Sequence, residues 1–119
     1  MPNSHTEAQV EQFWNDGYVT PFDCLTTDEA AECRRKLEEF EASVDGPIDE
    51  YIRIKCHLAF KWLEDIAHHP KILDAVEDLI GPNIMTFASR FWIKKSQDGT
   101  YVSWHQDSAY FGLDPNELV

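Results

Sequence analysis

The sequence has few basic residues and no long apolar run, and these two absences exclude several classes of protein. Lysine and arginine number 10 against 22 aspartates and glutamates, which gives a formal net charge of −12. Nucleic acids and anionic membranes bind basic patches, so neither is an expected partner. No apolar run approaches the roughly 20 residues of a membrane-spanning helix. The polar start of the chain also lacks the apolar core of a secretory signal.

Cysteines are few and irregularly spaced. The chain has three, Cys24, Cys33 and Cys56, with no C-x-x-C pair. An odd number without such spacing argues against a disulfide framework and against a zinc site. We therefore expect reduced, packed thiols in a cytoplasmic protein. A glycine-rich phosphate loop and a G-x-S-x-G nucleophile motif are also absent from the sequence.

The charge is distributed unevenly. Residues 1–52 carry 13 acidic and 3 basic residues, whereas residues 53–119 carry 9 and 7. Because most basic residues belong to the second half, that half could bind an anionic small molecule. A small-molecule substrate is the expected partner.

The first two thirds of the sequence predict helices. Thr26 and Glu29 form a capping box, which satisfies free amides at a helix start. Asp45 follows the end of that helix, Pro70 suits the first position of a later one, and Gly81 suits its end. The apolar spacing predicts helices near residues 10–16, 27–44, 59–66 and 70–80.

After residue 82 the apolar period changes to two, which is typical of strands. Met85, Phe87, Phe91 and Ile93 would share one face. A turn at residues 96–99 and a second strand to residue 107 predict a hairpin. We expect an α+β fold in one partial domain, residues 1–119. Its mainly helical region is 1–82, and the start of its β core is 83–119.

His105 and Asp107 are the main candidate for chemistry. Side chains at i and i+2 of a strand point to the same face, so an imidazole and a carboxylate would lie side by side. This is two thirds of the facial triad that holds Fe(II) in oxygenases. The alternative is a strand histidine that is hydrogen-bonded to a neighbouring carboxylate. His5, in the polar N-terminal segment, is expected to be solvated.

Four longer stretches stand out in the sequence: residues 12–19, 69–84, 91–95 and 103–113. Together, and in this order, they resemble the phytanoyl-CoA dioxygenase family of Fe(II)/2-oxoglutarate oxygenases. The resemblance implies a double-stranded β-helix (jelly roll) with helices leading into its first strands. It implies Fe(II) bound by His105 and Asp107, and 2-oxoglutarate near Lys55, His57 and Phe91. It also implies hydroxylation of a small organic substrate, such as an acyl chain or a secondary metabolite.

The sequence departs from the family in one respect. In relatives, a distal histidine ligand and an arginine that anchors 2-oxoglutarate lie well beyond the iron-binding strand, and this sequence stops before them. We therefore expect the chain alone to have little or no oxygenase activity. The alternative is a non-enzymatic remnant that serves as a binding or interaction module, with possible self-association through an open sheet edge.

Overall fold

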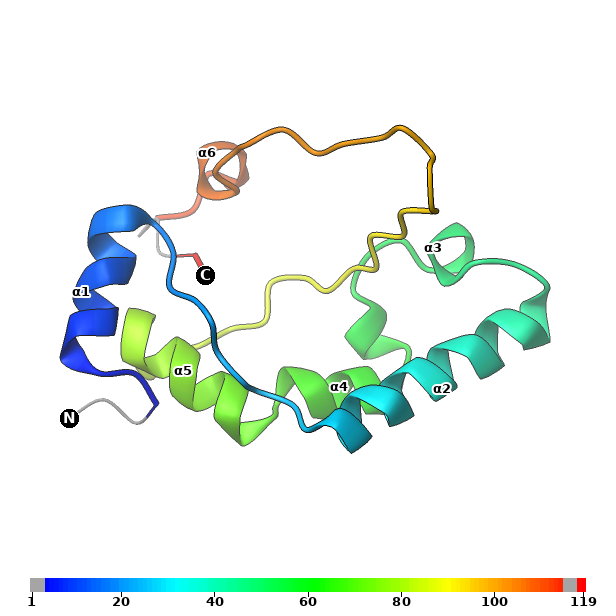
Figure 1. Ribbon diagram of the computed structural model, residues 1–119, viewed down its shortest axis with the longest axis horizontal. Coiled ribbons are helices and arrows are strands. Elements are labelled where there is room, and N and C mark those ends of the chain that lie inside the picture. Colours follow the sequence, from blue (N-terminus) through cyan, green and yellow to red (C-terminus); the bar gives the residue numbers. More distant parts are fainter. Residues whose placement is uncertain (1–3, 115–117) are drawn as a thin grey trace.

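The computed structural model describes residues 4–114 and 118–119, and it is helical (Figure 1). The four helices predicted from the apolar spacing are present as α1, α2, α4 and α5. Within the described residues, every helix is too short or too polar to cross a bilayer. The elements are α1 (Glu7–Asp16), α2 (Thr27–Val44), α3 (Ile48–Tyr51), the 3-10 helix η1 (Cys56–Leu58), α4 (Lys61–Ala67), α5 (Pro70–Ile80) and α6 (Ser108–Phe111).

Local signals set the helix ends. The capping box before α2 forms as predicted: the Glu29 amide donates to Thr26 Oγ1 at 3.2 Å, and the Thr26 amide donates to Glu29 Oε2 at 2.8 Å. Gly17 ends α1 with a φ of 80°, and Asp45 ends α2 with a φ of 57°. These left-handed residues stop each helix by redirecting the chain.

The helices pack pairwise around a small core. α1 lies against α5, α4 lies against both α5 and η1, and α2 lies against α3. Ile48, Cys56 and Ala75 are the buried apolar residues of the described chain. Phe40 of α2 meets Phe60 edge to face, with ring centroids 4.9 Å apart. Most other apolar side chains on these helices are only half-buried.

The N-terminal segment is fixed to α5 by a buried carboxylate. Asp78 accepts hydrogen bonds from the backbone amides of Ser4 and His5, at 2.7 and 2.8 Å. The ring of His5 stacks on Phe22 with a centroid distance of 5.2 Å, and His5 is only 7% exposed. The expectation that His5 is solvated is therefore wrong, because two partners distant in sequence bury it.

Residues 82–107 form a long segment without helix or strand (Figure 1). An outgoing leg, residues 82–95, runs from α5 toward α3, and a returning leg, residues 100–107, leads back to α6 (Figure 1). The turn expected between them is present, since Asp98 accepts hydrogen bonds from the amides of Lys95 (3.1 Å) and Thr100 (2.8 Å). The two legs nevertheless lie apart rather than pairing.

The expected α+β fold with the first strands of a jelly roll is wrong for this structure, whose described residues contain helices and no strand. The physical reason is that a strand needs a paired neighbour, and an isolated hairpin is marginal in water. Ser89, on the outgoing leg, instead accepts hydrogen bonds from η1. The open segment also expands the molecule, whose radius of gyration is 16.2 Å against about 13.5 Å for a compact chain of this length.

Candidate metal centre

The side chains of His105 and Asp107 converge at the end of the returning leg. His105 Nε2 lies 3.0 Å from Asp107 Oδ1, and the two side chains are 47% and 53% exposed. Both residues precede α6, and the Asp107 carboxylate makes no capping hydrogen bond to that helix in the described structure. The carboxylate therefore faces the imidazole rather than the helix start, although neither residue lies in a strand.

A backbone carbonyl orients the His105 ring. His105 Nδ1 lies 2.8 Å from the carbonyl oxygen of Ser103, which can only accept a hydrogen bond. Nδ1 therefore carries the hydrogen, and Nε2 faces Asp107. Histidines that bind metals commonly fix their second ring nitrogen in this way.

The geometry of this pair fits a metal ion. With the ring hydrogen on Nδ1, Nε2 and the carboxylate oxygen both present electron pairs, so the two atoms are suited to bind one cation between them. Two ligands at right angles, with bonds of about 2.1 Å, place their donor atoms about 3.0 Å apart. The observed separation of 3.0 Å matches that value, and it equally matches the hydrogen-bonded histidine and carboxylate given above as the alternative.

An apolar cavity of about 450 Å³ opens beside Asp107. Its walls come from the apolar faces of α4 and α5, from residues 84–89 and from Phe111. Phe87 and Phe111 close part of it, with ring centroids 4.8 Å apart. This size and lining are typical of small-molecule sites.

The three residues expected near 2-oxoglutarate lie elsewhere. None of Lys55, His57 and Phe91 belongs to the described lining of the cavity. Lys55 is exposed, with a φ of 58°, directly before η1. Phe91 packs against the ring of Trp62, with centroids 6.1 Å apart.

His57 is buried and engaged with the outgoing leg. Its Nδ1 lies 2.7 Å from Ser89 Oγ, and its backbone amide donates to the same oxygen at 2.9 Å. Ser89 also lines the cavity, so it connects His57 to the cavity wall. Sequence reasoning missed Ser89, because no local pattern marks a contact between residues 32 positions apart. It placed Phe87 on the apolar face but gave it no role.

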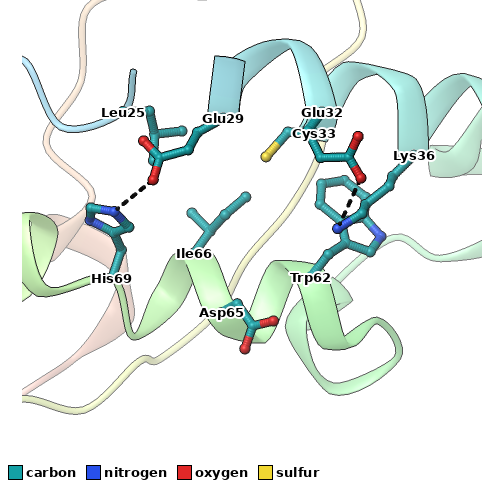
Figure 2. Close-up of a pocket in the computed structure, with 9 residues that line it drawn as sticks. All are labelled: Leu25, Glu29, Glu32, Cys33, Lys36, Trp62, Asp65, Ile66 and His69. Carbon is teal, nitrogen blue, oxygen red and sulfur yellow. Dashed lines mark ion pairs between the residues drawn. The ribbon is translucent and has the colours of Figure 1, made fainter. Parts of the chain in front are cut away.

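A smaller hollow of about 180 Å³ lies between α2 and the α4–α5 pair (Figure 2). His69 Nε2 faces Glu29 Oε1 at 3.6 Å across this joint, and Lys36 Nζ faces Glu32 Oε1 at 3.5 Å along α2 (Figure 2). Hydrogen bonds from the backbone and side chain of Thr26 hold the pKa of Glu29 below its ordinary value. Of these two contacts, only that between His69 and Glu29 joins α2 to the start of α5, whereas that between Lys36 and Glu32 lies within α2.

The described residues bring together two candidate metal ligands, His105 and Asp107. No cluster of three or more histidine, cysteine, aspartate or glutamate side chains suited to a metal occurs in the described part of the chain. The three cysteines are free thiols, and of these only Cys56 is fully buried. A complete facial triad would require another ligand beside His105 and Asp107.

Comparison with known proteins identifies the family. The model of the phytanoyl-CoA dioxygenase family matches residues 13–119. That match includes the His105–Asp107 pair and all the described residues that line the cavity. Among curated proteins and solved structures, no match was found. Because the family model covers nearly the entire sequence, this chain belongs to the phytanoyl-CoA dioxygenase family.

Proposed function

We propose that His105 and Asp107 are iron ligands of an Fe(II)/2-oxoglutarate-dependent oxygenase that hydroxylates a small organic substrate. The observation that carries this proposal is the convergence of His105 Nε2 and Asp107 Oδ1 at 3.0 Å, with Nδ1 held by a carbonyl. Family membership supports the kind of reaction. When bound, Fe(II) with 2-oxoglutarate and dioxygen supplies the oxidation that converts a C–H bond to C–OH.

The chain's own residues would position the substrate and surround it with an apolar, water-free surface. The apolar walls beside Asp107 would hold the organic part of the substrate and exclude water from it. Lys55, His57 and Phe91 remain the proposed contacts for 2-oxoglutarate. For His57 the support is its hydrogen bond to Ser89, which is one of the residues that line the cavity.

We further propose that the 119-residue chain holds iron weakly and has little activity by itself. Two protein ligands leave most coordination positions of an octahedral ion to water, and weak binding follows from so few ligands. The support is the absence of a third nearby metal ligand in the described residues.

Anaerobic titration with Fe(II), followed by calorimetry and by paramagnetic broadening of histidine ring signals, tests the ligand assignment. We expect weak binding that broadens the His105 signals and disappears in Asp107→Ala. His68→Ala is the matched control. His68 also faces a carboxylate, with Nδ1 at 3.4 Å from Glu64 Oε1, but this pair lies along α4 and its C-cap.

The outcomes separate the two proposals. Binding that survives Asp107→Ala, or that is lost in His68→Ala, would overturn the assignment of the ligands. A visible charge-transfer band on adding 2-oxoglutarate, with succinate formed under air, would support the oxygenase and contradict the low activity of the chain. An unbroadened His105 ring at saturating Fe(II) would contradict the metal centre and favour a non-enzymatic interaction module.

A further inference from the structure

The apolar cavity beside Asp107 has very little charge on its walls. Among its described lining residues, Asp107 is the only one with a charged side chain. Thr86 and Ser89 are the other polar ones, and the rest are aliphatic or aromatic. The smaller hollow between α2 and the α4–α5 pair differs, because three carboxylates and a lysine line it. A ligand in the larger cavity would therefore meet an apolar surface with one charged group beside it.

The basic residues of the second half of the chain lie outside this cavity. None of the seven lysines and arginines of residues 53–119 belongs to its described lining. Lys61 instead pairs with Asp65 along α4, and the guanidinium of Arg90 lies over the ring of Trp92, 4.1 Å from its centroid. The described walls therefore offer no cation to a carboxylate or phosphate group, so this cavity does not suit the anionic small molecule that the uneven charge suggested.

The carboxylate of Asp107 places negative charge at the edge of the cavity. Because the side chain is short, its carboxylate stays close to the cavity wall in every rotamer. The side chain is 53% exposed, and ion pairs at exposed positions change a binding constant by no more than about fivefold. An apolar ligand with a cationic end should gain affinity of that order, and one with an anionic end should lose a similar amount.

We propose that the substrate class of this cavity is a hydrophobic amine, with its hydrocarbon part against α4, α5 and Phe87 and its ammonium group beside Asp107. As the identity of a substrate, this inference rests on the function proposed above. As a binding preference it needs neither iron nor 2-oxoglutarate, so it can be tested separately. Fe(II) together with doubly charged 2-oxoglutarate adds no net charge, so the carboxylate would set the same preference in the complete enzyme.

Titration of the iron-free 119-residue chain with octylamine, 1-octanol and octanoate tests this preference, because the three probes share a hydrocarbon chain and differ in charge. At about pH 8 the amine is cationic and the acid is anionic. We expect octylamine to bind about threefold more tightly than 1-octanol and about tenfold more tightly than octanoate. Hexylamine should bind about tenfold more weakly than octylamine, because a shorter chain buries less apolar surface.

Methyl NMR signals locate the bound probe. Val76 on α5 and Met85 on the outgoing leg line the cavity, and their methyl signals should shift during the titration. Ile52 is outside the described lining, so its methyl signals should stay in place. Together these signals distinguish a ligand in the cavity from one on another apolar surface.

Variants that change one charge assign the preference to Asp107. Asp107→Asn should bring the affinities for octylamine and octanoate within about twofold of each other, whereas Asp107→Glu keeps the charge and should keep the order of affinities. Asp74→Asn, on α5 but outside the described lining, is the matched control for net charge and should also keep the order. Val119 lines the cavity as well, so the preference should survive amidation of its terminal carboxyl group.

Several results would overturn the proposal. These are octanoate binding as tightly as octylamine, an amine preference that persists in Asp107→Asn, and titrations that leave the Val76 and Met85 signals unshifted. The iron site is judged by a different measurement. Equal affinities for the amine and the acid, with Fe(II) binding lost in Asp107→Ala, would refute this inference alone. Amine preference without any broadening of the His105 signals by Fe(II) would refute the proposed iron site instead.

Discussion

Residues 4–81 and residues 82–107 have comparable shares of apolar residues, and the second region is richer in aromatic residues, yet the first region forms helices and the second forms no regular structure. A helix closes its hydrogen bonds between residues four apart, so capping and apolar spacing suffice to build it. A strand closes its bonds with another strand, and its own sequence cannot supply that neighbour. The comparison shows that an alternating apolar pattern predicts that a segment can pair as a strand, but not that it does.

The same substitution should destabilise the first region much more than the second. Ala31→Pro, inside α2, removes a backbone hydrogen bond and clashes with the preceding turn, which should cost about 3 kcal/mol of unfolding free energy. Ile93→Pro lies where no amide hydrogen bond exists in the described structure and should cost less than about 0.5 kcal/mol. Urea denaturation followed by far-UV circular dichroism measures both. A loss of similar size in both variants would show that the legs are paired in solution.

Removing the Asp78 carboxylate, which anchors the N-terminal segment, should give the next largest loss of unfolding free energy. Asp78→Ala leaves the amides of Ser4 and His5 without their charged acceptor, and we expect a loss of about 2 kcal/mol. Asp74→Ala, on the same helix but without a described bond to the N-terminal segment, is the control and should change little. Amide exchange at Ser4 and His5 should accelerate only in Asp78→Ala. Unchanged exchange there would contradict the anchor.

The capping box before α2 should contribute less. Thr26→Ala removes the hydroxyl that accepts from the Glu29 amide, which should cost about 1 kcal/mol. Thr27→Ala, at the first helical position, is the matched control and should be nearly neutral. Thermal unfolding monitored at 222 nm distinguishes them. Equal losses would mean that the cap does not fix the start of this helix.

Acid should weaken α2 through its surface ion pairs. A hydrogen bond from Arg35 lowers the pKa of Glu32 from its ordinary value of 4.5 to about 2. A lowered pKa means that the folded state favours the ionised carboxylate. The stabilisation is therefore complete above pH 4.5 and is lost as the pH falls toward 2.

Comparing helicity against pH in the wild type and in Glu32→Gln tests this, with Glu11→Gln on α1 as the control. The difference between wild type and Glu32→Gln should shrink as the pH falls, and also with added salt, because the pair is exposed. A difference that stays constant from neutral pH to pH 2 would rule out the ion pair as its cause.

Much of the helical region could be predicted from local residues. Thr26 with Glu29, and Pro70 with Gly81, marked real helix ends. A second capping box, Thr6 with Gln9, was equally readable in the sequence but was not used. By contrast, the bond from the His5 amide to Asp78 joins residues 73 positions apart, and no local pattern encodes it.

The candidate site likewise combines features that local sequence predicts with features that only the folded chain produces. The spacing of His105 and Asp107 indicated two neighbouring candidate ligands, and the bond from the His105 ring to Ser103 is local enough to orient one of them. The expected strand did not form, so the convergence does not depend on sheet geometry. The cavity beside Asp107 and the contact between His57 and Ser89 required the folded chain.

The sequence by itself determined where the helices begin and end, the uneven charge, and the short spacing of an imidazole and a carboxylate. Each of these depends on interactions within about one helical turn of chain. Only the tertiary structure decided that the two legs stay apart, that His5 is buried and that an apolar cavity borders Asp107. The physical reason is that hydrogen bonds and apolar contacts between distant residues must repay the entropy of closing long loops, and this balance depends on every partner present.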